Sequence, residues 1–190
     1  MHFTEPVYRN PYWPTWPLLE VTTGCTHNKC KFCTMYKGVR FGVPTMETIE
    51  EDLAELAATV PDAHTIQLLS ANPLALPYSK MKPILEKIRE YLPEMEYVYV
   101  AGRVTDLRNK TVEQLRELKE LGMREISLGV ESGDDWTLER INKGYHAADI
   151  LEQCHKLEKA GIVGPAKGSK PREVLCISED DLQFRLENLR

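Results

Sequence analysis

The chain has 190 residues, of which 42% are hydrophobic and 28% charged, a composition ordinary for a soluble globular protein with one core. The formal net charge of -5 argues against a general nucleic-acid or membrane-surface binder, because such a protein favours a basic stripe. The N-terminal residues do not have the basic region and following apolar run of a signal peptide, and no apolar run in the chain is long enough to cross a bilayer. We therefore expect a cytoplasmic protein without membrane attachment.

Residues 1–16 are rich in proline and aromatic residues and predict an N-terminal arm lying over the domain. The apolar, β-branched run Leu18–Thr22 predicts a strand, which ends at Thr23 and Gly24 just before the first cysteine. A unit of a strand followed by an amphipathic helix then recurs along the chain. The further predicted strands are Thr65–Leu69, Tyr97–Ala101 and Glu125–Val130.

Each helical segment between these strands has one apolar face. The inward positions are Ile49, Leu53, Leu56 and Val60, then Met81, Ile84, Leu85, Ile88 and Leu92, then Val112, Leu115 and Leu118, and finally Ile150, Leu151, Cys154 and Leu157. Capping boxes are predicted at Thr48 and Glu51 for the first helix and at Thr111 and Gln114 for the third, and the second helix is expected to start at Ser79. The third helix should end at Gly122 and the last at Gly161. Residues 136–141 predict a short additional helical piece, and Pro83 is expected in about the first turn of its helix.

Alternating strands and helices of this length predict parallel strands joined by right-handed crossovers. In a barrel of this kind, the loops that follow the strands form the functional face. The polar and cysteine-containing segments discussed below all fall in such loops.

Cys25, Cys30 and Cys33 lie in one short loop, and three thiolates that converge there suit either an iron–sulfur cluster or zinc. A closed zinc site needs a fourth protein ligand, which His27 could supply. A cluster held by three cysteines instead leaves one iron open. Cys154 is at an inward helical position and is interpreted as a small core residue, and Cys176 is far along the chain.

The segments 24–33, 128–133, 138–144 and 157–162 together resemble the radical S-adenosylmethionine (SAM) superfamily, in the region shared by methylthiotransferases and oxygen-independent coproporphyrinogen oxidases. The resemblance implies an α/β fold, a partial (β/α) TIM-like barrel with the cluster loop after its first strand. It also implies a [4Fe–4S] cluster that binds SAM and, on reduction, cleaves it to a 5′-deoxyadenosyl radical. An electron donor such as flavodoxin or ferredoxin would then be a partner, and the substrate cannot be read from the sequence.

The resemblance assigns cluster ligation to Cys25, Cys30 and Cys33. By the same matching, Phe32 packs near the adenine, and its alternative is a core phenylalanine. Asn72 stands where the family often has a segment that meets the methionyl amine, and a turn role before Pro73 is its equal alternative.

Three charged residues at the predicted strand ends complete the candidate site. Glu131 matches a position that can bond the ribose hydroxyls, and Lys143 matches one that can pair with the SAM carboxylate. Arg103 could serve that carboxylate or the substrate. The alternative for all three is a salt-bridged rim at the barrel mouth.

Two features depart from the family pattern. Four residues rather than three separate Cys25 from Cys30, which adds little loop-closure entropy. After Ile162 the expected fifth strand is replaced by a linker-like stretch at 163–172, followed by a charged helical pattern at 179–190. We therefore expect a core over 17–162 that is truncated after about four β/α units, with an atypical tail over 163–190 and an open sheet edge.

Two other functions remain open at this point. A zinc-stabilised binding module would use Cys25, Cys30, Cys33 and His27 as a closed site and would unfold on chelation. An electron carrier would normally have four cysteine ligands and no cofactor pocket. Polar residues at successive strand ends favour the radical SAM enzyme over both.

Overall fold

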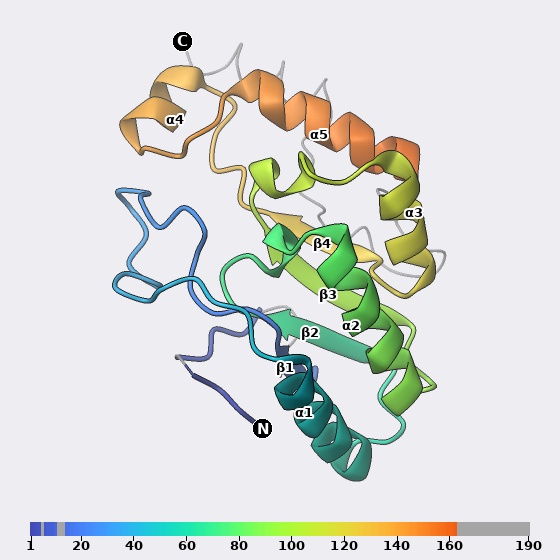
Figure 1. Cartoon of the computed structure of the whole chain (residues 1–190). Helices are drawn as coiled ribbons and strands as arrows, with labels where there is room; N and C mark the ends of the chain where they lie inside the picture. Colours follow the sequence, from blue (N-terminus) through green and yellow to red (C-terminus); the bar gives the residue numbers. More distant parts are fainter. Residues whose placement is uncertain (5, 11–13, 163–190) are drawn as a thin grey trace.

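The computed structural model describes residues 1–4, 6–10 and 14–162, which form one open α/β sheet covered by helices (Figure 1). The strands are β1 (Leu18–Glu20), β2 (Thr65–Leu69), β3 (Tyr97–Gly102) and β4 (Glu125–Leu128). The helices are α1 (Met46–Thr59), α2 (Tyr78–Tyr91), α3 (Val112–Glu120), α4 (Asp135–Arg140) and α5 (Ala147–Ala160), with 3-10 turns η1 (Pro73–Ala75) and η2 (Val104–Leu107). The tail predicted at 163–190 lies outside the described residues.

The four strands are all parallel and follow the order β1-β2-β3-β4, so each β/α unit adds one strand beside the last. Within the described residues the sheet is not closed, and the predicted partial barrel of about four β/α units is confirmed. Parallel neighbours place the carboxyl ends of all strands on one edge. Figure 1 shows the loop after β1 and helix α4 at that edge.

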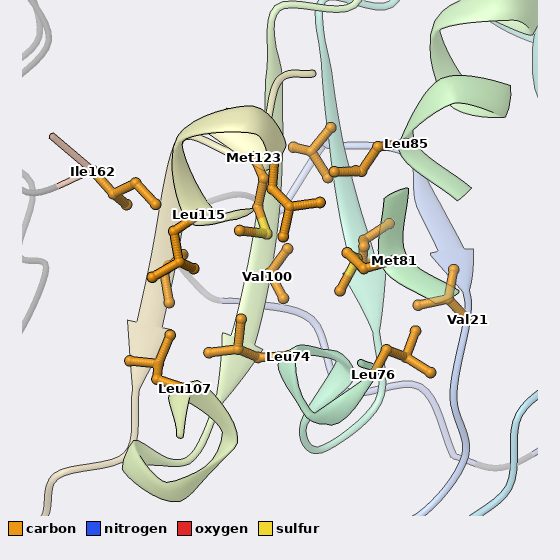
Figure 2. Packing of buried hydrophobic residues seen from close by; sticks show 14 of the residues in the cluster. Val21, Leu74, Leu76, Met81, Leu85, Val100, Leu107, Leu115, Met123 and Ile162 are labelled. Atoms are coloured by element: carbon orange, nitrogen blue, oxygen red, sulfur yellow. The ribbon is translucent and has the colours of Figure 1, made fainter. Parts of the chain in front are cut away.

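The core lies between one face of the sheet and the helices, because alternate strand residues are apolar and point the same way. Val98 and Val100 of β3 are fully buried there, as are Met81 of α2 and Leu115 of α3. Figure 2 shows Val100, Leu74, Leu115 and Met123 gathered in this layer. This packing holds the strand ends, and thus the loops that follow them, at fixed positions.

The opposite face of the sheet carries polar side chains that contact the N-terminal segment. Glu20 is only 2% exposed, and its carboxylate accepts hydrogen bonds from the Thr4 hydroxyl at 2.7 Å and backbone N–H at 3.2 Å. Gln67 accepts a bond from the Asn10 backbone N–H at 3.3 Å. These contacts satisfy buried polar groups that would otherwise face the open side of the sheet.

Several helix boundaries differ from the prediction. The N-cap of α1 is Thr45, whose side chain accepts from the Thr48 N–H at 3.2 Å, so the capping box placed at Thr48 is wrong. Val60 follows the helix and is 37% exposed, so it is not a core residue. Pro83 is inside α2, beyond its first turn, since the helix starts at Tyr78.

Two other predicted helix ends are confirmed. Thr111 and Gln114 form the predicted capping box of α3, and Gly161 ends α5 in the left-handed conformation. Cys154 is buried in α5, as expected of a core residue. The predicted strand ends at Thr22 and Val130 are wrong, because β1 stops at Glu20 and β4 at Leu128, each two residues earlier. Among the described helices, none is long and apolar enough to cross a membrane.

Candidate functional site

The loop between β1 and α1 contains the three clustered cysteines and is fixed at both its ends. Thr23 and Gly42 form an antiparallel bridge that closes its base. Gly24 has φ +61°, and a Cβ added there would lie 2.9 Å from the Arg40 backbone, so only glycine fits. The Ser70 hydroxyl at the end of β2 donates to the Gly24 carbonyl at 3.1 Å, which joins the loop to the sheet.

The middle of this loop is bonded to the segment that follows α4. The Lys31 N–H donates to the Ile141 carbonyl at 2.9 Å, and the Asn142 side-chain amide donates to the Lys29 carbonyl at 3.0 Å. His27 Nε2 donates to the Asn142 carbonyl at 2.7 Å, and burial lowers the pKa of the His27 imidazole. The loop is therefore held between the ends of β2 and α4.

The three thiols share one neighbourhood within this loop. Cys30 is buried, while Cys25 and Cys33 are half-buried. Burial raises the pKa of the Cys30 thiol, and the positive charges of Lys143 and Arg103 act in the opposite direction. Burial has the larger effect, so the pKa of Cys30 stays above its ordinary value, and the two nearby cations partly offset that rise.

The described residues do not form a closed zinc site. Within them, no group of three or more His, Cys, Asp or Glu side chains is placed to hold a single ion. A tetrahedral zinc needs four donors at about 2.0–2.3 Å from one point. His27, the proposed fourth ligand, instead has its Nε2 on the Asn142 carbonyl. Three cysteines without a fourth protein ligand among the described residues suit a cluster that leaves one iron open rather than a closed zinc site.

Lys143 is the central cation of the site and is only 5% exposed. Its Nζ lies 2.9 Å from Oε1 of Glu131. The same nitrogen lies 5.5 Å from the ring centroid of Phe32 and 5.8 Å from that of Tyr145. Phe32 is 51% exposed, which excludes the alternative of a core phenylalanine. The pair of Lys143 and Phe32 thus connects the cysteine loop to the segment after β4.

Glu131 occupies a left-handed backbone conformation, with φ +64°. A non-glycine residue rarely adopts this region, and its strain is typical of functional positions. Gly129, two residues earlier, leaves space for the ion pair, since a Cβ there would lie 3.0 Å from Glu131 Oε1 and 3.2 Å from Lys143 Nζ. The carboxylate is 37% exposed and can therefore accept from a bound molecule as well as from Lys143.

Arg103, at the end of β3, has an incomplete set of partners. Its Nη2 donates to the Lys143 carbonyl at 2.6 Å, and its guanidinium lies 5.8 Å from the Tyr145 ring centroid. Its Nε is buried and has no hydrogen-bond partner among the described residues. A buried N–H without an acceptor is costly, so a ligand that supplies an acceptor here would satisfy it.

Asn72 is fully buried, and its amide holds other parts of the site. Its Oδ1 accepts from the Thr26 N–H at 3.2 Å, and its Nδ2 donates to the Thr26 hydroxyl at 2.6 Å and to Asp106 Oδ2 at 3.0 Å. Since Thr26 follows the first cysteine directly, Asn72 positions the cysteine loop in this structure. A contact of Asn72 with SAM remains a prediction.

Behind Asn72 lies a buried polar network that the sequence did not reveal. Asp106 also accepts from the Arg103 N–H at 2.8 Å, and burial raises the pKa of its carboxyl. Lys110 is 2% exposed and donates to the carbonyls of Leu74 and Asp106 and to the Asn109 side chain. The network joins the turns after β2 and β3, which are far apart in sequence.

Tyr145 is a further site residue that the sequence analysis missed. It is buried under Arg103 and Lys143, and its hydroxyl donates to the carbonyls of Gly129 and Val130. Burial raises the pKa of this phenol. The phenol therefore stays neutral and donates to the backbone after β4. An aromatic residue directly after Lys143-Gly144 was the available signal.

Comparison with known proteins gives a family and several structural relatives. A family model described as "Radical SAM superfamily" matches residues 19–168. The heme chaperone HemW of Bacillus subtilis (strain 168) is 25% identical over 146 residues, which are 73% of this chain and 38% of HemW. The chain thus spans well under half of this curated relative.

Solved structures show the same fold. The radical SAM methyltransferase TsrM from Kitasatospora setae, with cobalamin and a [4Fe–4S] cluster bound, matches with a TM-score of 0.60 and 17% identity, over 78% of this chain and 29% of that one. The FeFe-hydrogenase maturase HydG from Carboxydothermus hydrogenoformans matches with a TM-score of 0.54 and 18% identity, over 77% and 34%.

Proposed function

The chain belongs to the radical SAM superfamily, and from this premise we propose that it forms a SAM-cleaving site with a [4Fe–4S] cluster held by Cys25, Cys30 and Cys33. When bound, the cluster and SAM supply the reductive cleavage that yields a 5′-deoxyadenosyl radical. The substrate is outside the proposal. Because the chain covers only 38% of HemW and 29% of TsrM, we do not assign the activity of either whole protein to this chain.

One observation carries the proposal: the cysteine loop meets Lys143 and Arg103 at the carboxyl edge of the sheet, where its Phe32 ring lies 5.5 Å from Lys143 Nζ, and the Nε of Arg103 is buried without an acceptor among the described residues. Ligands of open α/β sheets bind outside the carboxyl ends of the strands. An anionic group bound here would meet two cations and complete the hydrogen bonding of Arg103.

The chain's own residues take distinct roles in the proposed complex. Lys143 attracts the SAM carboxylate, and Arg103 Nε either donates to the same carboxylate or holds the substrate. Glu131 accepts from the ribose hydroxyls through the part of its carboxylate that faces solvent. Phe32, half-exposed above Lys143, covers the adenine. Asn72 fixes the start of the cysteine loop through Thr26.

Anaerobic reconstitution tests the proposal directly. We expect about four irons and four sulfides per chain, no stoichiometric zinc, and release of 5′-deoxyadenosine from SAM when dithionite is present. Serine variants of Cys25, Cys30 and Cys33 should each lose both iron and SAM cleavage. Cys154→Ala, in the core of α5 and away from the loop, is the matched control and should retain both.

Two results would contradict the proposal. One tightly bound zinc per chain, lost together with the fold on chelation, would favour the binding module instead. A full cluster without SAM cleavage, in a chain that also fails to bind SAM at equilibrium, would show that the cation-lined site does not serve SAM.

A further inference from the structure

The turn after α4 ends this helix with a residue in the left-handed conformation. The Asn142 N–H donates to the Glu139 carbonyl at 2.9 Å. The Lys143 N–H donates to the Leu138 carbonyl, also at 2.9 Å, and Asn142 itself has φ +55°. These two bonds form a Schellman motif, whose left-handed position is taken by glycine or, less often, by asparagine. Position 142 therefore needs a residue that tolerates this backbone conformation.

This turn binds the backbone of the cysteine loop on both sides of Cys30. The side-chain amide of Asn142 donates at 3.0 Å to the Lys29 carbonyl, which belongs to the peptide group before Cys30. The Ile141 carbonyl accepts at 2.9 Å from the Lys31 N–H, which belongs to the peptide group after Cys30. Of the three clustered cysteines, Cys30 is the buried one. Two neighbouring residues of one turn thus hold both peptide groups of this cysteine.

The stretch 26–29, which separates the first two cysteines, depends on Asn142 at two of its four residues. Besides the bond to the Lys29 carbonyl, the backbone carbonyl of Asn142 accepts from His27 Nε2 at 2.7 Å. Gly144 leaves room for this imidazole, since a Cβ added there would lie 2.8 Å from His27 Cε1. The stretch is one residue longer than the family pattern, and Asn142 contacts both its middle and its end.

We propose that Asn142 is a positioning residue that holds Cys30 in place as a ligand of the cluster. The proposal rests on the proposed function and deepens it by naming the side chain that fixes the second cysteine of the loop. Asn142 acts through the loop backbone, as residues outside the ligand set do when they orient metal ligands. Because Lys143 follows directly, the same turn sets the position of Cys30 relative to the cation of the proposed SAM site.

The opposite end of α4 offers a control that changes stability without touching the loop. Asp134 is the N-cap of this helix, and its carboxylate accepts from the Thr137 N–H at 2.8 Å and from the Thr137 hydroxyl at 2.6 Å. Loss of an N-cap and loss of one hydrogen bond cost comparable free energy. Asp134→Ala and a change at Asn142 should therefore destabilise the chain similarly, while only the second releases Cys30.

The test uses two variants of Asn142 that keep the turn. Asn142→Asp retains the shape of the side chain and its tolerance of the left-handed backbone, but it places an acceptor oxygen against the Lys29 carbonyl. Asn142→Gly removes the same donor without adding a charge, and glycine adopts φ +55° without strain. In each cluster-free chain, the rate at which iodoacetamide alkylates every cysteine is followed by mass spectrometry, and urea unfolding gives the stability.

We expect alkylation of Cys30 to accelerate about fivefold in both Asn142 variants, because the buried thiol reacts when the loop opens locally. Alkylation of the buried Cys154 should keep the parent rate. After reconstitution, the two variants should lose iron to a chelator about fivefold faster and show altered g values of the reduced cluster in electron paramagnetic resonance. Asp134→Ala should match the parent chain in all three measurements, although its stability falls.

Parent-like alkylation of Cys30 in both Asn142 variants would overturn the proposal. An equal acceleration in Asp134→Ala would also overturn it, because the effect would then follow from lost stability alone. A parent chain that takes up no iron would instead contradict the proposed function. In that case the alkylation rates of the cluster-free chains still decide whether Asn142 holds Cys30 in place.

Discussion

Lys143 and Glu131 form an ion pair of 2.9 Å in which the lysine is buried and the carboxylate reaches solvent. The two residues follow different elements, and Arg103 binds the Lys143 backbone carbonyl from a third, the end of β3. The pair therefore presents a cation to the inside of the site and an acceptor to its opening. This arrangement suits a ligand with both a carboxylate and hydroxyl groups.

Loss of the Lys143 charge should weaken SAM binding. Hydrogen bonds to charged groups contribute about 1.5–3 kcal/mol, so we expect Lys143→Met to raise the SAM dissociation constant of the reconstituted protein about tenfold or more. Lys159→Met, an exposed lysine of α5, should leave it unchanged. Equilibrium binding measures both. An unchanged dissociation constant in Lys143→Met would assign the ion pair a purely structural role.

Removal of the Asn72 amide should destabilise the chain and loosen the cysteine loop. Asn72→Ala removes one of the hydrogen bonds to the buried Asp106 carboxylate and the acceptor of the Thr26 N–H, so we expect a loss of about 1–3 kcal/mol in unfolding free energy. Urea unfolding of the cluster-free chain measures it, with the exposed Ser79→Ala as the control. Iron incorporation should fall in Asn72→Ala. Parent-like values of both quantities would show that the loop is positioned by other contacts.

Burial of Lys110 should make stability rise with pH in an alkaline window. Burial lowers the pKa of Lys110 to about 8 in the folded chain, below its ordinary value of 10.5. Between these values the unfolded chain binds more protons, so this group's contribution to the unfolding free energy increases with pH.

The difference in unfolding free energy between the parent chain and Lys110→Met should therefore shift by about 2 kcal/mol in favour of the parent from pH 7 to pH 10. Lys80→Met, which removes an exposed lysine, should show no such shift. If Lys110→Met does not fold, Lys110→Arg, which keeps the positive charge, replaces it as the variant compared with the parent chain. A pH-independent difference would mean that Lys110 keeps its ordinary affinity for protons.

A methyl group at Gly102 should disturb the turn after β2. A Cβ there would lie 2.5 Å from the Leu74 Cβ, so η1 would have to move, and with it Asn72. We expect Gly102→Ala to cost about 1–3 kcal/mol in unfolding free energy. Gly38→Ala is the control variant, because nothing lies within 4 Å of the added Cβ. The alanine at position 38 is strained only by its backbone conformation, with φ +82°. Equal losses in the two variants would show that the turn accommodates the methyl group.

The sequence was sufficient for the elements and for the edge of the sheet that carries the site, because both depend on local periodicity. Apolar spacing located the helices, and the capping box at Thr111 was found since its two members are three residues apart. The error at the start of α1 has the same local origin: threonine is a good N-cap at either Thr45 or Thr48, and in the structure the Thr45 side chain caps the Thr48 N–H.

The polar network could not be predicted, because its members meet only through tertiary structure. Asn72 and Asp106 are 34 residues apart, and Thr26 precedes Asn72 by 46. From the sequence, Lys110 looks like an ordinary surface lysine before a helix. The family resemblance led us to predict residues that face the cofactor, whereas the residues that support them from behind depend on this chain's own packing.

The backbone strain at Glu131 has a consequence for how this chain would change under selection. Glycine or asparagine tolerates φ +64° better than glutamate, so either substitution should relieve strain on the order of 1–2 kcal/mol. In a library of variants screened only for resistance to heat or protease, glycine or asparagine should therefore replace glutamate at position 131. In a library screened for SAM cleavage, glutamate should be retained, because the more stable variants lack its carboxylate. At position 131, selection for stability and selection for SAM cleavage thus favour different residues.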